Sequence, residues 1–179
     1  MKQKRILVTG AGGSPGANFI ASLRLVPEED FYIVGADINK YHLELTTGVD
    51  KKYILPPTTS PDYLDKLNML IEREQIDLVH SQPEQEVWFI SHHKDLVKAR
   101  TLFPTPETLK ITYDKESLNV LLGAKGIAVP QAYRITDHDD LKKALAALLQ
   151  KQDRVWLRAT RGGGSKAALP VNTLLQAEG

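Results

Sequence analysis

The sequence Arg5-Ile-Leu-Val-Thr-Gly10, followed by Ala-Gly-Gly-Ser-Pro-Gly16, is a short apolar run that breaks into glycines. This pattern is typical of a β-strand that turns sharply into a helix. Gly10, Gly13 and Gly16 allow positive φ angles and a close approach to a ligand, and the free N–H groups of the following helix would face bound negative charge. The turn therefore predicts an anion-tolerant backbone, and the same glycines also fit a structural turn that binds nothing.

Composition narrows the class of protein. The 179 residues suffice for one domain and part of another, at about 150 residues per domain. The formal net charge is +1, with both signs interspersed, so nothing favours nucleic acid or an anionic membrane as a partner. The absence of cysteine excludes disulfides and thiolate chemistry and fits a reducing compartment. We expect a cytoplasmic protein without a targeting segment.

Strands and helices alternate along the first hundred residues. The pattern predicts strands at 6–8, 31–37, 53–55 and 76–80, a short strand near Leu102, and helices over 16–25 and from Ser60-Pro61 onward. A loop is expected after Asp37. Ser60 is the expected N-cap of its helix, with Pro61 at the first helical position. Brief connections between alternating elements predict a doubly wound parallel sheet with helices on both faces.

The pattern changes at Phe103-Pro104-Thr105-Pro106, which predicts a boundary between a first domain, 1–104, and a second, 105–179. The second domain is expected to be α+β. Its predicted elements are a helical stretch through residue 125, strands at 131–135, 154–158 and 167–171, and a helix at 137–150 capped by Asp137. Because a further element is just starting at 173–177, we expect this second domain to be truncated.

The glycine turn and Asp37 together favour a dinucleotide site, since an acidic residue ending the second strand can bind a ribose hydroxyl. The extended short-chain dehydrogenases have glycines spaced like these, together with a tyrosine and a lysine four residues apart. None of the six tyrosines here has a lysine four residues later. This chain therefore lacks the acid–base pair of an NAD(P)-dependent epimerase or reductase, and we keep that function as an alternative. A non-catalytic small-molecule-binding module is a second alternative.

Motifs in the second half of the chain resemble the start of an ATP-grasp domain. They are Tyr113-Asp-Lys115, then Gly126-Ile-Ala-Val-Pro130, then Trp156-Leu-Arg158 followed by Arg161-Gly-Gly-Gly-Ser165. Upstream, Val34-Gly-Ala-Asp37 and the segment 49–56 resemble strands of the Rossmann-like domain that precedes it. The whole chain is most similar to the carbamoyl-phosphate synthase large-chain type and to related amino-acid and peptide ligases.

This resemblance implies an ATP site in the second domain. Lys115 matches a lysine that reaches the nucleotide. Arg158 stands where many members place a lysine on the phosphates, and it keeps the charge with a planar set of donors. The glycine loop implies backbone donors folding over the triphosphate. The residues expected at the ATP phosphates are Lys115, Arg158, Gly162, Gly163, Gly164 and Ser165.

The resemblance also implies an acceptor-substrate site in the first domain, formed by Gly12, Gly13, Ser14 and Asp37 with the loop 80–84. The expected cofactors are ATP and magnesium, whose protein ligands would lie downstream of this chain, so no metal ligand is assigned and the catalytic residues remain unidentified. The intact ligase would form an acylphosphate from ATP and a small carboxylate, which an amine attacks. We expect the chain alone to be inactive. We also expect it to self-associate through unpaired strand edges.

Overall fold

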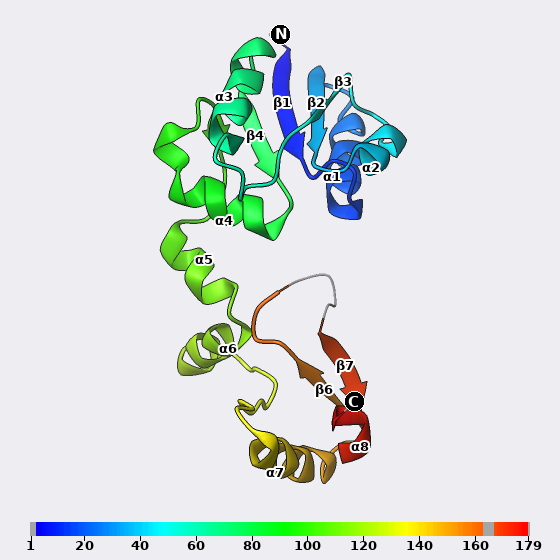
Figure 1. The fold of residues 1–179 in the computed structure, drawn as a ribbon, viewed down its shortest axis with the longest axis vertical. Helices are drawn as coiled ribbons and strands as arrows, with labels where there is room; N and C mark the ends of the chain where they lie inside the picture. The colour runs from blue at the N-terminus through cyan, green and yellow to red at the C-terminus, as the bar shows by residue number, and fades with distance from the viewer. Residues whose placement is uncertain (1–2, 163–166, 179) are drawn as a thin grey trace. The chain divides into compact units, whose positions relative to one another are not determined.

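The computed structural model describes residues 3–162 and 167–178 (Figure 1). The chain divides into two compact units between Pro106 and Glu107. The elements before this point are β1 (Lys4–Thr9), α1 (Ser14–Arg24), β2 (Phe31–Asp37), α2 (Lys40–Leu45), β3 (Lys51–Ile54), α3 (Tyr63–Arg73), β4 (Leu78–Ser81), α4 (Glu84–His92), the 3-10 turn η1 (Lys94–Leu96) and β5 (Arg100–Thr101). We call this part unit 1.

Unit 1 contains a five-stranded sheet in the order β3-β2-β1-β4-β5, with every neighbouring pair parallel. Strand β1 lies between β2 and β4, so the chain winds outward from the centre of the sheet in both directions. The α/β doubly wound parallel sheet predicted from the sequence is confirmed. In sheets of this kind, ligands bind at the carboxyl ends of the strands where the strand order reverses, here beside β1 and β4.

Both faces of the sheet are covered, because alternate residues of a strand point to opposite faces. Ile6 and Val8 of β1 pack with Ile20 of α1 and Leu43 of α2 on one face. The intervening Leu7 packs on the other face, in a cluster that contains the following residues of α3 and α4: Tyr63, Leu67, Leu70, Ile71 and Ile90. These two apolar layers fix the sheet and hold its loops at the carboxyl edge.

Several element bounds of unit 1 differ from the sequence prediction, β4 among them, which runs from Leu78 to Ser81 and not over 76–80. Strand β3 runs from Lys51 to Ile54, so it begins two residues before the predicted start. Helix α3 begins after Asp62 and not after Ser60, whose hydroxyl donates to Asp62 Oδ1 at 2.5 Å. The expected loop after Asp37 contains α2, because the side chain of Asn39 accepts hydrogen bonds from two backbone N–H groups and caps a six-residue helix.

The second part, unit 2, comprises α5 (Pro106–Thr112), α6 (Lys115–Ala124), α7 (His138–Leu149), β6 (Val155–Arg158), β7 (Ala168–Val171) and α8 (Leu174–Glu178). Strands β6 and β7 form the antiparallel hairpin that the sequence predicts. Asp137 caps α7, as expected. The strand predicted at 131–135 is wrong: this segment adopts no regular structure, and no described strand pairs with it.

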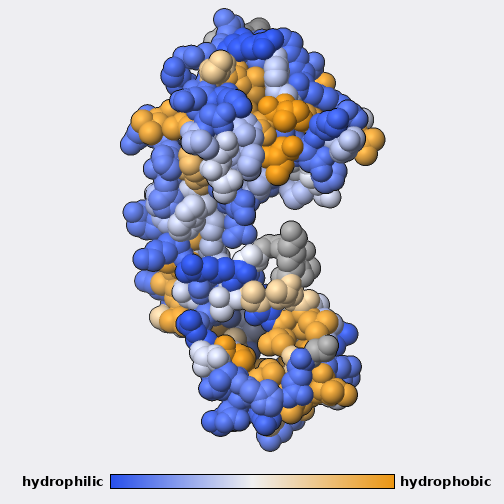
Figure 2. All heavy atoms as spheres, viewed as in Figure 1, coloured by the Kyte–Doolittle hydropathy of each residue, from blue (hydrophilic) through white to orange (hydrophobic). Residues whose placement is uncertain are grey.

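The core of unit 2 is small. Leu141 and Leu145 of α7 pack against Val155 of β6 and Val171 of β7. Apolar side chains also gather on the surface around the β6–β7 hairpin and α8, where Leu169 and Leu175 are exposed (Figure 2). None of the helices among the described residues has the length and hydrophobicity needed to cross a membrane.

Candidate functional site

The glycine turn after β1 is built tightly against its surroundings. Gly10 has a φ of +63°, and a Cβ at this position would lie 2.5 Å from Cδ of Pro83. A Cβ on Gly16 would lie 2.9 Å from Cα of Ala11 and closer still to the Gly10 carbonyl oxygen. Both positions therefore exclude a side chain for reasons of packing alone. Gly10 and Gly16 are therefore explained without a ligand, whereas a Cβ on Gly13 would make only ordinary contacts.

The Asp37 carboxylate is held by the backbone around it. Its Oδ2 accepts a hydrogen bond from the Gly12 N–H at 2.9 Å, and its Oδ1 accepts one from the Asn39 N–H at 2.9 Å. The neighbouring N–H groups of Ala11 and Gly13 donate to the carbonyl oxygens of Ala36 and Gly10. Three successive donors of the turn are thus used within the protein. The anion that faces the turn is the protein's own carboxylate.

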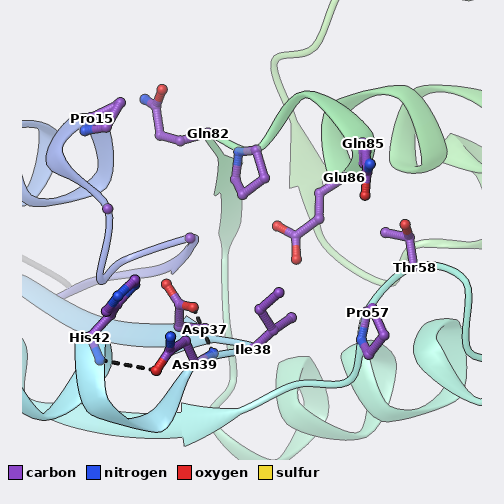
Figure 3. Close-up of a pocket in the computed structure, with 13 residues that line it drawn as sticks. Pro15, Asp37, Ile38, Asn39, His42, Pro57, Thr58, Gln82, Gln85 and Glu86 are labelled. Atoms are coloured by element: carbon purple, nitrogen blue, oxygen red, sulfur yellow. Dashed lines mark hydrogen bonds between the residues drawn. The ribbon is translucent and has the colours of Figure 1, made fainter. Parts of the chain in front are cut away.

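A pocket of about 370 Å³ opens at the carboxyl ends of β1, β2 and β4 (Figure 3). Of the residues expected at an acceptor site, Gly13 and Asp37 line this pocket. Gly12 does not line it, but its N–H donates a hydrogen bond to Asp37 Oδ2. Ser14 is exposed at the start of α1 and is not among the lining residues. The full lining is Gly10, Gly13, Pro15, Asp37, Ile38, Asn39, His42, Pro57, Thr58, Gln82, Pro83, Gln85 and Glu86.

The loop after β4 divides between the pocket and the sheet beneath it. Gln82 and Pro83 line the pocket. His80 instead stacks on Phe19 of α1, with ring centroids 3.6 Å apart, and burial lowers the pKa of its imidazole. Ser81 points to a buried cluster under the pocket. The expected substrate loop therefore contributes two of its residues to the lining.

Glu86, in the second half-turn of α4, is a buried carboxyl group that the sequence reasoning missed. Its Oε2 accepts a hydrogen bond from Ser81 Oγ at 2.8 Å and another from Thr9 Oγ1. The two hydroxyl oxygens lie 2.7 Å apart. Burial raises the pKa of Glu86, and the charge of Asp37 raises it further. Figure 3 shows its carboxyl group directed into the pocket.

Tyr63 lies beside this cluster. Its side chain is fully buried, and its hydroxyl makes no hydrogen bond with any described residue. Burial and then the nearby Glu86 raise the pKa of this phenol. The sequence held a weak signal for the cluster, because Glu86 and Ile90 are four residues apart and so share one helical face. In the structure both residues are buried. An acidic residue on the inward face of a helix marks a site or a structural cluster.

In unit 2 the start of α6 is tied to the segment that follows β6. Lys115 Nζ donates to the carbonyl oxygens of Gly162 at 2.8 Å and Thr160 at 3.4 Å. The backbone N–H of Lys115 also donates to Thr160 at 2.9 Å. Arg161 Nε lies 3.3 Å from Asp114 Oδ2. The structure therefore brings Lys115 and Gly162, two residues expected at the ATP phosphates, into direct contact.

Arg158, a third expected phosphate contact, ends β6. Its side chain is exposed and forms no ion pair with a described residue. It lines a second hollow, of about 470 Å³, with its neighbours on β6 and the residues 167–169 of the β7 side. Gly163, Gly164 and Ser165, also expected at the phosphates, lie outside the described residues. Across residues 3–162 and 167–178, no group of three or more acidic or histidine side chains is arranged to hold a metal ion.

Comparison with known proteins gives matches of structure only. No protein-family model matches the chain, and no curated protein matches it by sequence. Among solved structures, the biotin carboxylase domain of Hydrogenobacter thermophilus 2-oxoglutarate carboxylase, in complex with MgADP, ADP and bicarbonate, matches with a TM-score of 0.61 and 15% identity over 97% of this chain. N5-carboxyaminoimidazole ribonucleotide synthetase from Thermotoga maritima matches with a TM-score of 0.57 and 18% identity over 99% of this chain.

D-alanyl-alanine synthetase A from Vibrio cholerae matches over 98% of this chain, with a TM-score of 0.56 and 23% identity. The shared feature is the fold. These neighbours are ATP-grasp enzymes, and the chain spans 38%, 43% and 54% of their respective lengths. None of the three is a carbamoyl-phosphate synthase, so that part of the resemblance stays a prediction.

Proposed function

We propose that this chain forms the first part of an ATP-dependent ligase of the ATP-grasp superfamily, most similar to the carbamoyl-phosphate synthase large chain. Unit 1 would be the Rossmann-like domain that precedes the nucleotide-binding domain, and unit 2 would begin that domain. The proposal is supported by a fold likeness to ATP-grasp enzymes that extends over both units, covering 97–99% of this chain. The ligase activity of the intact enzyme is also part of what we propose.

The observation that carries an ATP site in unit 2 is the contact between Lys115 and Gly162. The Lys115 ammonium is bound by neutral carbonyl groups at the base of the glycine loop, so its charge is free to pair with a phosphate. Arg158 adds a second exposed cation at the end of β6. Lys115, Arg158 and Gly162 would contact the phosphates, together with Gly163–Ser165 of the loop.

In the proposed reaction the γ-phosphoryl group of ATP passes to a carboxylate oxygen, giving ADP and an acylphosphate. An amine then attacks the acyl carbon, phosphate leaves, and the amine gives up a proton. The role of unit 2 would be to hold the triphosphate and offset its charge, which is the main contribution that proteins make to phosphoryl transfer. Magnesium would be needed on the phosphate oxygens, and its protein ligands are not among the residues assigned here.

Displacement of a fluorescent ATP analogue, trinitrophenyl-ATP, tests the assignment. ATP should displace the analogue from the full chain, and NAD should not. Lys115→Met and Arg158→Gln should each weaken ATP binding by at least about tenfold, since a hydrogen bond to a charged group contributes roughly 1.5–3 kcal/mol. The control variants Lys142→Met and Arg154→Gln remove exposed cations of unit 2 that lie outside the proposed site. They should bind ATP as the unaltered chain does.

Two results would contradict this function. If NAD competes as well as ATP, the NAD(P)-dependent epimerase or reductase is favoured. If Lys115→Met and Lys142→Met bind ATP equally, the phosphate site is not the one assigned. Self-association also stays a prediction: β6 and β7 each have one edge that no described strand covers. A single monomeric species in analytical ultracentrifugation would contradict it.

A further inference from the structure

The pocket of unit 1 has an unusual set of charges for a site next to a glycine turn. The residues that line it include two carboxyl groups, Asp37 and Glu86, and no lysine or arginine. His42 is the one other titratable side chain in that lining. Both residues are more than nine-tenths buried, with 8% of Asp37 and 6% of Glu86 exposed. The space between them is therefore acidic.

Each carboxyl group has hydrogen-bond acceptor positions that the described part of the protein does not use and that a ligand could use. Asp37 accepts one backbone hydrogen bond on each oxygen, which uses two of its roughly four lone-pair positions. Glu86 accepts its two hydrogen bonds on Oε2, and its Oε1 accepts none from a described residue. Glu86 lines the pocket, and Figure 3 shows its carboxyl group directed into it.

None of the described groups that contact or perturb the Glu86 carboxyl group is positively charged. The residues nearest its carboxyl group are Thr9, Ser81 and Tyr63, which are neutral, and Asp37, which shares its sign. Two carboxyl groups that face one pocket oppose each other's ionisation, and a cation between them relieves that repulsion. Thr9 and Ser81 orient Glu86 without supplying the missing charge.

An anionic ligand is disfavoured in the same pocket. The N–H groups of Ala11, Gly12 and Gly13, which such a turn would offer to a phosphate or carboxylate, are already used. An anion would therefore meet two carboxyl groups and no lysine or arginine in the lining. The electrostatics of the pocket oppose the anion-binding role that the glycines first indicate.

We propose that this pocket binds the protonated amino group of a small organic amine, with Asp37 and Glu86 as its hydrogen-bond acceptors. The apolar lining, which includes Ile38 and Pro57, would contact the carbon chain of the amine. Thr58 and Gln85 make no side-chain hydrogen bond with a described residue and are available to a polar group farther along it. Only the role of this ligand as the amine substrate rests on the proposed ligase function, and in that role the ammonium group would lose a proton before it attacks.

A pair of probes with opposite charge tests the site without ATP. The amide NMR spectrum of the ¹⁵N-labelled full chain is recorded during titration with n-butylammonium and, separately, with butyrate. Butylammonium should shift the amide signals of Gly12, Gly13 and Asn39 in a saturable way, and butyrate should not. Binding of butyrate that equals or exceeds that of butylammonium would overturn the proposal, and so would the absence of any effect of butylammonium.

Variants then test the two acceptors. Asp37→Asn and Glu86→Gln should each weaken butylammonium binding by about tenfold. Asp65→Asn and Glu28→Gln make the same changes at exposed positions of unit 1 and should leave it unchanged. Because Asp37 also holds the turn, its variant counts only if its spectrum is that of a folded protein. If Asp37→Asn does not fold, the test rests on Glu86→Gln and on the comparison of butylammonium with butyrate. Unchanged butylammonium binding in Glu86→Gln would refute the role of Glu86.

The amine titration and the ATP-displacement assay fail independently. Amine binding in a chain that does not bind ATP would keep this site and remove the ligase function. ATP binding in a chain that ignores butylammonium would remove this site and leave the ligase function standing. The two measurements therefore separate the inference from the function on which its biological role depends.

Discussion

Replacement of Glu74 by glutamine should destabilise unit 1 by about 2 kcal/mol. The Glu74 side chain is 3% exposed at the end of α3. Its Oε1 accepts a hydrogen bond from the Tyr53 hydroxyl at 2.5 Å, its Oε2 accepts one from the Tyr32 hydroxyl at 3.0 Å, and Lys51 Nζ lies 3.2 Å from both oxygens. This one side chain therefore connects α3 to strands β2 and β3.

The expected loss of stability follows from the two hydrogen bonds that tyrosine hydroxyls donate to Glu74. A hydrogen bond to a charged group contributes roughly 1.5–3 kcal/mol, and glutamine keeps one acceptor oxygen while it removes the charge. The lysine adds little, because its side chain is half exposed and solvent screens the pair. For a domain near one hundred residues, a loss of about 2 kcal/mol lowers the melting temperature by roughly 8–16 °C.

The fluorescence of Trp88 provides the assay. The chain has two tryptophans, and Trp156→Phe leaves Trp88 as the reporter of unit 1. Urea unfolding of Glu74→Gln is compared in this background with that of Glu72→Gln. Glu72 is an exposed residue of the same helix whose ion pair with Lys98 is on the surface. The Glu72 variant should lose less than about 0.5 kcal/mol, and equal losses in both variants would show that Glu74 is not the stabilising contact.

Three further predictions concern side chains of unit 1, the first with a control in unit 2. Gly16→Ala should cost about 2–3 kcal/mol, since the added Cβ meets backbone, whereas Gly123→Ala in α6 meets only ordinary contacts and should be neutral or stabilising in thermal unfolding. Tyr63→Phe should unfold at the same or higher urea concentration, because it removes a buried hydroxyl without a partner among the described residues; a loss above about 1 kcal/mol would contradict this. The hydrogen bond from Tyr53 lowers the pKa of Glu74, so its stabilisation is complete above the unfolded value of about 4.3 and is lost as pH falls through the folded pKa. Acid should therefore reduce the stability of the unaltered chain more than that of Glu74→Gln, and parallel acid profiles would count against it.

The elements that the sequence predicts well are those whose signals are local. Strand β2 coincides with its predicted range because an apolar run ends in an acidic residue and a loop. Asp137 caps α7 as expected, since a capping bond joins residues three apart. The strand predicted at 131–135 failed for the opposite reason. Alternating side chains indicate a strand only where another strand lies alongside, and none does among the described residues.

The chemistry of the unit 1 pocket depends on contacts between distant segments. The parallel register that sets Thr9 opposite Ala36 brings Asp37 level with the glycine turn, and the carboxylate then takes the Gly12 N–H. Glu86 gains its role only because Thr9 and Ser81 end neighbouring strands beneath α4. No pattern along the chain specifies these pairings. The sequence therefore indicated two residues that line this pocket, Gly13 and Asp37, but not the contacts that set the charges around it.

We expect the nucleotide to bind to unit 2 and not to the glycine turn of unit 1. Amide NMR spectra of the ¹⁵N-labelled full chain, recorded with increasing ATP, locate the bound nucleotide directly. ATP should cause saturable shifts of the Lys115, Arg158 and Gly162 signals and leave the signals of Gly12 and Gly13 unmoved. Shifts confined to Gly12 and Gly13 would contradict it.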